Sequence, residues 1–256
     1  MYIDSHCHIN FPDLASKLSE VFSLMQRNHV SHALCIGVEL EKFAEIIALA
    51  EAHSNIYASV GVHPDHEDCT EPGVAQLVQL AQHPKVVAIG ETGLDYFRLS
   101  GDLEWQRDRF RTHIRAAREC GKPLVIHTRE AAVDTLKLMR EEKAGEAGGV
   151  MHCFTESLEV AQAAMEMGFY ISFSGIVTFK SAAALRDVAA AVPLDRMLIE
   201  TDSPYLAPVP YRGKTNQPGY VKHVAAEIAR VKGVSIEDVG EVTTRNFFRL
   251  FKTARY

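Results

Sequence analysis

Two histidines, His6 and His8, stand two positions apart in residues 3–8, close to the start of the chain. Alternate side chains of a β-strand point to the same face. If these residues form a strand, both imidazoles face one side at a spacing that suits one metal ion, and Cys7 faces the other side. The pair alone does not establish a metal site, because polar residues are also common at the end of a strand.

Five further residues of metal-ligand type each follow an apolar run of the chain. They are His63, Glu91, His127, His152 and Asp202. Neutral imidazole nitrogen suits zinc or manganese, and carboxylate oxygen also accepts harder ions such as magnesium. Each of these residues taken singly has an ordinary structural explanation too. These residues can form one metal site only if the fold brings the ends of the apolar runs together.

Eight apolar runs bounded by turn residues alternate with eight amphipathic runs. The predicted strands are 2–9, 30–38, 56–62, 86–90, 124–127, 150–154, 169–177 and 197–201. The predicted helices are 13–28, 40–53, 72–83, 102–120, 131–142, 157–167, 181–192 and 219–232, with one or two more in 235–251. Asp13 and Ser157 are of the residue types that cap helix N-termini.

This alternation predicts a parallel sheet, and strands that are apolar throughout predict a sheet buried on both faces. Eight repeats within 256 residues favour the α/β class with a (β/α)8 TIM-type barrel, one domain over 1–256 with extra C-terminal helices. No Gly-x-Gly-x-x-Gly motif follows the first strand, which argues against a dinucleotide-binding sheet. Active sites of barrels lie at the C-terminal ends of the strands, and the candidate ligands all fall there.

Composition limits the location and the partners. The five cysteines are odd in number and lack paired spacing, so we expect a reducing compartment and a cytoplasmic protein. No leader pattern and no apolar run of about 18 residues is present, so no membrane association is expected. A net charge of −6 excludes a generally basic surface, so a polyanionic substrate would need a local patch or bound cations. Nothing indicates an obligate protein partner.

Several motifs resemble the motif series of the TatD family of metal-dependent deoxyribonucleases. They are residues 4–8 (DSHCH), 61–64 (GVHP), 90–95 (GETGLD), 125–129 (VIHTR), 152–154 (HCF), 200–204 (ETDSP) and 243–247 (TTRNF). The resemblance covers essentially the whole chain. It implies an amidohydrolase-like metal-dependent hydrolase with a distorted (β/α)8 barrel and a divalent metal centre.

The resemblance also implies two divalent ions, of magnesium, manganese or zinc, and a set of ligands for them. These are His6, His8 and Asp202 on the first ion, His127 and His152 on the second, and Glu91 as a bridge. Two ions about 3.5 to 4 Å apart can activate a shared water and stabilise the attacking and leaving oxygens of a phosphoryl displacement. Asp202 would also orient this water and accept its proton. The alternative is that Asp202, which precedes Ser203 and Pro204, only caps a turn.

Other polar residues near the ligands have expected supporting roles. Glu200 shares the strand parity of Asp202 one layer deeper, so it should support ligands from behind, as should Asp4 and Asp95. Cys7 and Cys153 flank ligands and are expected to face away from them as packing residues.

Cationic and aromatic residues just beyond the strand ends are candidates for substrate contacts. They are His63, Tyr96, Arg98, Arg129, Lys180, Tyr205 and Arg212. Such side chains above a metal pair suit phosphate binding and base stacking on DNA that is single-stranded or has a free end. For Arg98, Lys180 and Arg212, an ordinary solvated loop explains the residues equally well.

Three functions remain open at this point. The first is hydrolysis of DNA phosphodiesters, removing nucleotides from a strand end. The second is hydrolysis of an amide, ester or phosphotriester on the same barrel; relatives with a bridging carboxylated lysine would have Lys where this chain has Glu91. The third, a noncatalytic metal-binding scaffold, is disfavoured because the ligand set is complete and leaves room for water.

Overall fold

The computed structural model describes residues 1–67 and 69–255 and contains one eight-stranded parallel sheet in the order β1 to β8. Each strand pairs with the next one along the chain, so the sheet curls into a barrel. The strands are β1 Tyr2–Cys7, β2 Val30–Cys35, β3 Ile56–Val60, β4 Val86–Asp95, β5 Leu124–Arg129, β6 Gly149–Met151, β7 Tyr170–Phe173 and β8 Met197–Ile199. The predicted (β/α)8 TIM-type barrel is confirmed.

Backbone contacts just beyond β8 close the barrel against β1. Cys7 and Ser203 form an isolated parallel bridge. The His8 N–H donates to the Ser203 carbonyl at 2.7 Å, and the Asp202 N–H donates to the His6 carbonyl at 2.9 Å. The two ends of the chain's strand series therefore meet at the residues predicted to bind metal.

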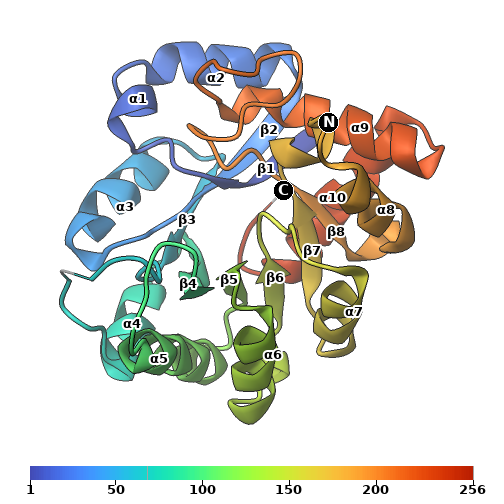
Figure 1. Ribbon diagram of the computed structural model, residues 1–256. Helices are drawn as coiled ribbons and strands as arrows, with labels where there is room; N and C mark the ends of the chain where they lie inside the picture. The colour runs from blue at the N-terminus through green and yellow to red at the C-terminus, as the bar shows by residue number, and fades with distance from the viewer. Residues whose placement is uncertain (68, 256) are drawn as a thin grey trace.

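The helices surround the strands as an outer ring, as Figure 1 shows. Their bounds are α1 Pro12–Ala15, α2 Leu18–Arg27, α3 Phe43–Ala52, α4 Val74–Ala81, α5 Glu104–Cys120, α6 Ala132–Glu141, α7 Leu158–Glu166, α8 Ala183–Ala191, α9 Val221–Lys232 and α10 Ile236–Leu250. Within the described residues, no helix is both long and apolar enough to cross a membrane.

Some predicted boundaries differ from the observed ones. The predicted helix 13–28 is two helices, and its first begins with Pro12 after Phe11, so Asp13 is not an N-cap. Proline suits this first helical position because it has no N–H to satisfy. Ser157 does cap α7, since its side chain accepts a hydrogen bond from the Val160 N–H. The predicted strand 169–177 ends as β7 at Phe173 and continues as a 3-10 turn, Gly175–Thr178.

The interior of the barrel near the strand starts is apolar. One buried cluster takes at least one residue from every strand, including Ile3, Leu34, Tyr57, Val87, Val125, Val150, Tyr170 and Leu198. Phe247 and Leu250 of α10 and the following Phe251 pack on this cluster, and Tyr57 exchanges hydrogen bonds with the backbone of Arg255. This end of the barrel is closed by the C-terminal segment.

At the opposite end of the barrel, β4 continues beyond its predicted end at residue 90. The pairing of β4 with β5 shifts register between Ile89 and Thr92, and Glu91 lies at this irregularity. Such a bulge changes the direction of the side chain that it carries. Gly93 next to it has φ +138°, and a Cβ there would lie 1.9 Å from the His127 carbonyl oxygen. Glycine is therefore required where β4 passes His127.

Candidate metal centre

A cleft of about 710 Å³ opens at the C-terminal ends of the strands. Five of the six predicted ligands line it, namely His8, Glu91, His127, His152 and Asp202. His6 lies beneath them and is completely buried. The barrel therefore brings together all six side chains that the family resemblance assigns to a metal centre.

The first group of ligand atoms gathers around one oxygen of Glu91. His6 Nε2 lies 3.3 Å from both His8 Nε2 and Glu91 Oε2. Asp202 Oδ1 lies 3.5 Å from His6 Nε2 and 3.4 Å from His8 Nε2. His8 Nε2 and Glu91 Oε2 are 4.0 Å apart. The backbone bonds that close the barrel hold these residues together, and Asp202 has φ +56°, a left-handed conformation that is uncommon outside glycine.

The second group gathers around the other oxygen of Glu91. Glu91 Oε1 lies 2.7 Å from His152 Nε2 and 3.2 Å from His127 Nδ1. These two ring nitrogens are 3.3 Å from each other. His63 Nε2 is also 3.2 Å from Glu91 Oε1, so the structure places His63 among these atoms. In the sequence, His63 was one of the ligand-type residues at the strand ends, but the resemblance left it outside the ligand set and it was also a candidate for substrate contact.

Both groups fit divalent metal ions. Ligands at about 2.0–2.1 Å from a tetrahedral ion are separated from one another by about 3.3 Å. The separations between ligand atoms within the two groups range from 2.7 to 4.0 Å and so lie around this value. Bare imidazole nitrogens such as His6 Nε2 and His8 Nε2 also gain little from facing each other unless a cation or proton lies between them. The donor set of imidazoles and carboxylates is one that zinc and manganese accept.

Ionisation of the groups is consistent with a cation site. Burial acts to raise the pKa of Glu91, but the rings of His152, His63 and His6 hold it well below its ordinary value. Burial likewise opposes protonation of His63, yet Glu91 and Asp65 raise its pKa to about 9. Burial and the neighbouring His152 lower the pKa of His6. Glu91 thus raises the pKa of His63 together with Asp65, and that of His152 together with Glu200, and a metal ion bound at these two rings would displace their protons.

Carboxylates stand behind three of the rings, on the side away from Glu91. His152 Nδ1 is 3.2 Å from Glu200 Oε1, and His127 Nε2 is 3.2 Å from Asp95 Oδ2. Such outer carboxylates fix the orientation of a ligand ring and increase its basicity. The third carboxylate is Asp65, which is paired with His63 Nδ1.

Asp65 was not singled out from the sequence, although its position two residues after a histidine was the available signal. Asp4 differs from these carboxylates, because its oxygens accept from the backbone N–H of His6 and from the N–H and hydroxyl of Thr201. It therefore fixes the strand ends and touches no ligand ring through these bonds.

The rim of the cleft carries a cation and aromatic rings. The Arg129 guanidinium lies over the ring of Phe97 at 3.7 Å, and within residues 1–67 and 69–255 it has no carboxylate partner. Arg98, in contrast, is paired with Asp65 at 2.9 Å. Tyr205 is 56% exposed, which leaves its ring accessible on the rim.

Other predicted substrate contacts lie outside the lining of the cleft. The Tyr96 hydroxyl donates to Asp134 and accepts from Arg107. Lys180 is exposed beyond the lining, and Arg212 stacks on Phe179. Tyr96 and Lys180 could contact only a substrate that extends past the cleft.

The two cysteines next to ligands behave differently from each other. Cys7 is fully buried, and its thiol donates to the Leu34 carbonyl, as a packing residue would. Cys153 lines the cleft, with its sulfur 3.2 Å from the Ser174 hydroxyl. The expectation that Cys153 faces away from the site is therefore wrong. The reason lies in the backbone: β6 ends at Met151, and Cys153 has φ +43°, so the alternation of a strand no longer applies at this residue.

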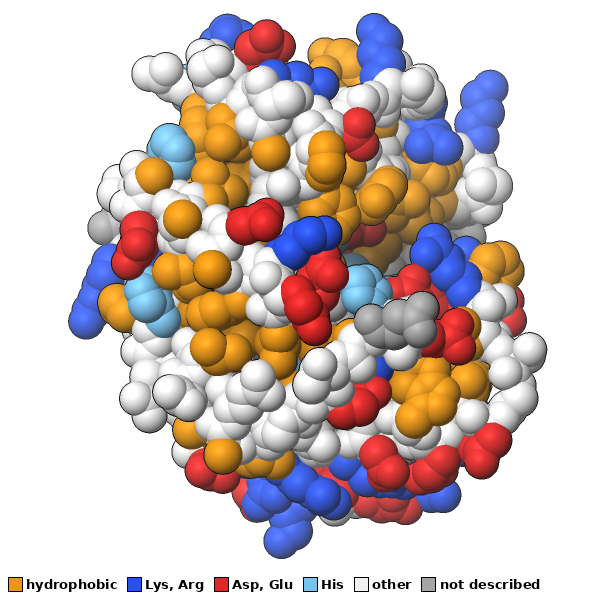
Figure 2. All heavy atoms as spheres, turned by 90° about the vertical axis from the view of Figure 1, so that its left-hand side faces the viewer, with side chains coloured by type: hydrophobic (Ala, Val, Ile, Leu, Met, Phe, Trp, Pro, Cys, Tyr) orange, Lys and Arg blue, Asp and Glu red, His pale blue; other side chains and the backbone are white. Residues whose placement is uncertain are grey.

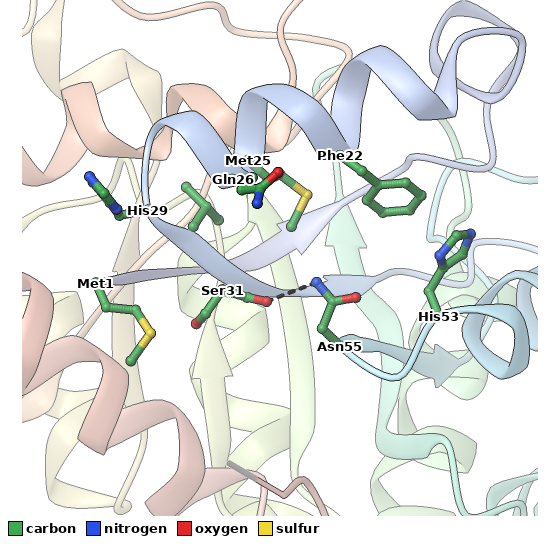
Figure 3. Close-up of a pocket in the computed structure, with 9 residues that line it drawn as sticks. Met1, Phe22, Met25, Gln26, His29, Ser31, His53 and Asn55 are labelled. Atoms are coloured by element: carbon green, nitrogen blue, oxygen red, sulfur yellow. Dashed lines mark hydrogen bonds between the residues drawn. The ribbon is translucent and has the colours of Figure 1, made fainter.

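A second hollow of the molecule lies on the outside of the barrel, beside α2 and the start of β2. Figure 3 shows Phe22 and His53 on one side of it and Met1 and His29 on the other. Among the described residues, neither histidine belongs to a ligand group.

Charged side chains of both signs are interspersed on the face shown in Figure 2, so no broad basic surface covers that face.

Comparisons with known proteins find similar proteins over nearly the whole chain. The family model described as TatD related DNase matches residues 3–252. The uncharacterised metal-dependent hydrolase YcfH of Escherichia coli K12 is 46% identical over 253 residues, 97% of this chain and 95% of YcfH. The protein named 3'-5' ssDNA/RNA exonuclease TatD of Enterobacter lignolyticus is 34% identical over 231 residues, 88% of this chain and 89% of the relative.

A solved structure is also similar over the whole barrel. The TatD homologue YjjV of Escherichia coli superimposes with a TM-score of 0.91 at 29% identity, covering 98% of both chains. Organophosphorus hydrolase variants match with TM-scores of 0.65 and 0.69 at 16% identity, which indicates a shared fold alone. The family match over nearly the whole length means that this chain belongs to the TatD family and is a metal-dependent hydrolase.

Proposed function

We propose that the protein binds two divalent metal ions and uses them to hydrolyse phosphodiester bonds of DNA, from a strand end. The observation that carries the proposal is the division of Glu91 between two ligand groups. Its Oε2 faces His6 and His8, and its Oε1 faces His127 and His152. A carboxylate placed in this way can bridge two ions and fix the distance between them.

The nature of the substrate is supported by the rim of the cleft. Arg129 has no carboxylate partner among the described residues, so its donors are available for a phosphate. The exposed ring of Tyr205 offers a surface on which a base of single-stranded DNA can stack. A TatD relative is named as an exonuclease of single-stranded DNA and RNA, and this agrees with a single-stranded end as substrate.

The roles of individual residues in the proposed reaction follow from their positions. Bound ions would supply charge that activates water and offsets the negative charge of the phosphate. Asp202 lies at the edge of the first ligand group and lines the cleft, so it can orient the attacking water and accept its proton. Arg129 would hold a neighbouring phosphate, so that the scissile bond lies above Glu91. The positive ions would also reconcile an acidic protein with an anionic substrate.

A panel of metals and substrates tests this function. Protein stripped with EDTA and resupplied with Mg²⁺, Mn²⁺ or Zn²⁺ should shorten a single-stranded DNA oligonucleotide, and EDTA should stop the reaction. The variant Asp202→Asn should lower turnover by about 10²- to 10⁴-fold, which is the usual contribution of a general base. The matched control Asp187→Asn, an exposed carboxylate on α8, should leave turnover unchanged.

The same panel includes cyclic amides, esters and phosphotriesters. Rapid turnover of one of these compounds, with DNA intact under every metal, would replace the nuclease proposal by the amide, ester or phosphotriester alternative. End-labelled oligonucleotides show the polarity of cleavage. Digestion that starts at the labelled end releases the label in the first step, whereas digestion from the other end retains the label on the shortened strand.

A further inference from the structure

We propose that His63, held by Asp65, is a direct ligand of the second metal ion, together with Glu91, His127 and His152. The inference rests on the proposed two-ion centre and adds to it a residue that the resemblance left outside the ligand set. His63 Nε2 lies 3.2 Å from Glu91 Oε1, the same distance as His127 Nδ1. The ligand atoms of His63, Glu91 and His127 all lie within 4.8 Å of one another.

The first support comes from what stands behind each ring. The three histidines around Glu91 Oε1 each present one nitrogen to this oxygen and the other nitrogen to a carboxylate. The pairs are His63 with Asp65, His127 with Asp95 and His152 with Glu200. A histidine that binds metal usually donates its second N–H to such a carboxylate or to a carbonyl. His63 therefore shares the arrangement of the two residues already assigned to the second ion.

The first ligand group provides a contrast within the same centre. His6 Nδ1 and His8 Nδ1 are buried, and within the described residues neither has a hydrogen-bond partner. The carboxylate support is thus confined to the rings around Glu91 Oε1. It marks His63 as a member of that group.

The second support is the rigidity with which the chain holds His63. Its N–H donates to the Val38 carbonyl at 2.9 Å, and its carbonyl accepts from Arg109, whose side chain is 1% exposed. Asp65 is in turn held by Arg98 at 2.9 Å. Ligands of a metal site need such fixed orientation, because small displacements weaken binding.

The consequence is a difference between the two ions. The first would have two imidazoles and two carboxylates, whereas the second would have three imidazoles and a single carboxylate oxygen. Nitrogen ligands favour zinc and other transition metals over magnesium. The second site should therefore prefer Zn²⁺ or Mn²⁺ over Mg²⁺ more strongly than the first does.

Metal titration of the stripped full-length protein tests the proposal without any substrate or phosphate present. Zn²⁺ binding is followed by competition with a chromophoric chelator and by calorimetry. Wild-type protein should take up two ions, and His63→Ala should bind one of them at least about 100-fold more weakly. Asp65→Asn, which keeps the imidazole in place, should weaken the same step by about 10- to 100-fold.

The matched control is His66→Ala, because His66 lines the same cleft with its ring 6.3 Å from that of His63 and belongs to no ligand group among the described residues. It should bind both ions as the wild type does. Thermal unfolding of the metal-free variants establishes that each is folded. Addition of imidazole should restore part of the lost affinity in His63→Gly, an effect that a purely structural role would not produce.

The outcomes separate the two proposals. Two ions bound with unchanged affinity by folded His63→Ala would overturn the ligand role of His63 and leave the two-ion centre intact. A wild-type protein that takes up a single ion would overturn the two-ion centre. In that case His63 is decided by the same comparison, because a weaker single site in His63→Ala supports its role and an unchanged one refutes it.

Discussion

The two ends of the barrel interior are both buried but are built from opposite chemistry. At the strand starts, apolar residues from all eight strands pack against Phe247, Leu250 and Phe251 of the C-terminal segment. At the strand ends, the interior holds histidines and carboxylates, with His6 and Glu200 fully buried. A TIM-type barrel generally keeps catalysis at the second end and stability at the first.

The contrast shows what each end contributes. The apolar end gains free energy from removing surface from water and from close packing. The polar end places the Glu91 carboxylate among the rings of His152, His63 and His6, which hold its pKa well below the ordinary value although it is buried. Substitutions at the two ends should therefore separate metal binding and activity from the free energy of unfolding.

The largest expected effect is the loss of the bridge. Glu91→Ala removes the oxygens shared by both ligand groups, so two-ion binding should be lost and hydrolysis should fall by about 10³-fold or more, roughly 4 kcal/mol of transition-state stabilisation. Metal analysis and turnover measure this effect. Circular dichroism should show a native barrel, because the apolar end is untouched.

An isosteric variant sharpens this prediction. Glu91→Gln keeps the volume of the side chain but offers one oxygen instead of two, so it should retain at most one ion. A folded Glu91→Ala protein with two bound ions and full activity would show that Glu91 is not the bridge.

The next effect belongs to the apolar end. Phe251 is fully buried against the cluster that takes residues from all eight strands, so Phe251→Ala should lower the free energy of unfolding by about 3–5 kcal/mol. Denaturant unfolding of the metal-free protein measures this loss. Metal stoichiometry under native conditions should stay at the wild-type value, and a missing ion in the folded variant would break the proposed separation of the two ends.

Much of this architecture follows from the sequence because it depends on local patterns. Alternating apolar and amphipathic runs predicted the barrel, and the rule that barrel sites lie at strand ends predicted which side chains meet. Ligand-type residues such as His127 and His152 are recognisable by type and position alone. The cytoplasmic location, the single domain and the absence of an obligate partner stay predictions.

The rest depends on backbone geometry that a pattern does not encode. The bulge of β4 aims Glu91 between two groups, and no periodicity reports it. The position of His63 depends on Arg109, which lies on α5, and on Asp65, which follows the motif at 61–64. The turn at Cys153 places its side chain in the cleft against the simple alternation of a strand.

The smallest effect belongs to the polar end, in a residue that supports a ligand without being one. Glu200 is fully buried, with Oε1 3.2 Å from His152 Nδ1 and 2.7 Å from the Cys153 backbone nitrogen. Glu200→Gln keeps an oxygen for that N–H but loses the charge that orients and polarises the ring. Metal affinity should fall by about 10- to 100-fold, as for other carboxylates behind a metal ligand.

The control for Glu200 is Glu227→Gln, a largely buried carboxylate of α9 that pairs with Arg230 on the outside of the barrel. Both variants are compared by chelator competition and by thermal unfolding without metal. Affinity should fall in Glu200→Gln alone, because Glu227 touches no ligand ring. If Glu200→Gln binds metal as tightly as the wild type, the outer carboxylates only fill space behind the rings, and the contrast between the two ends then depends on the ligands alone.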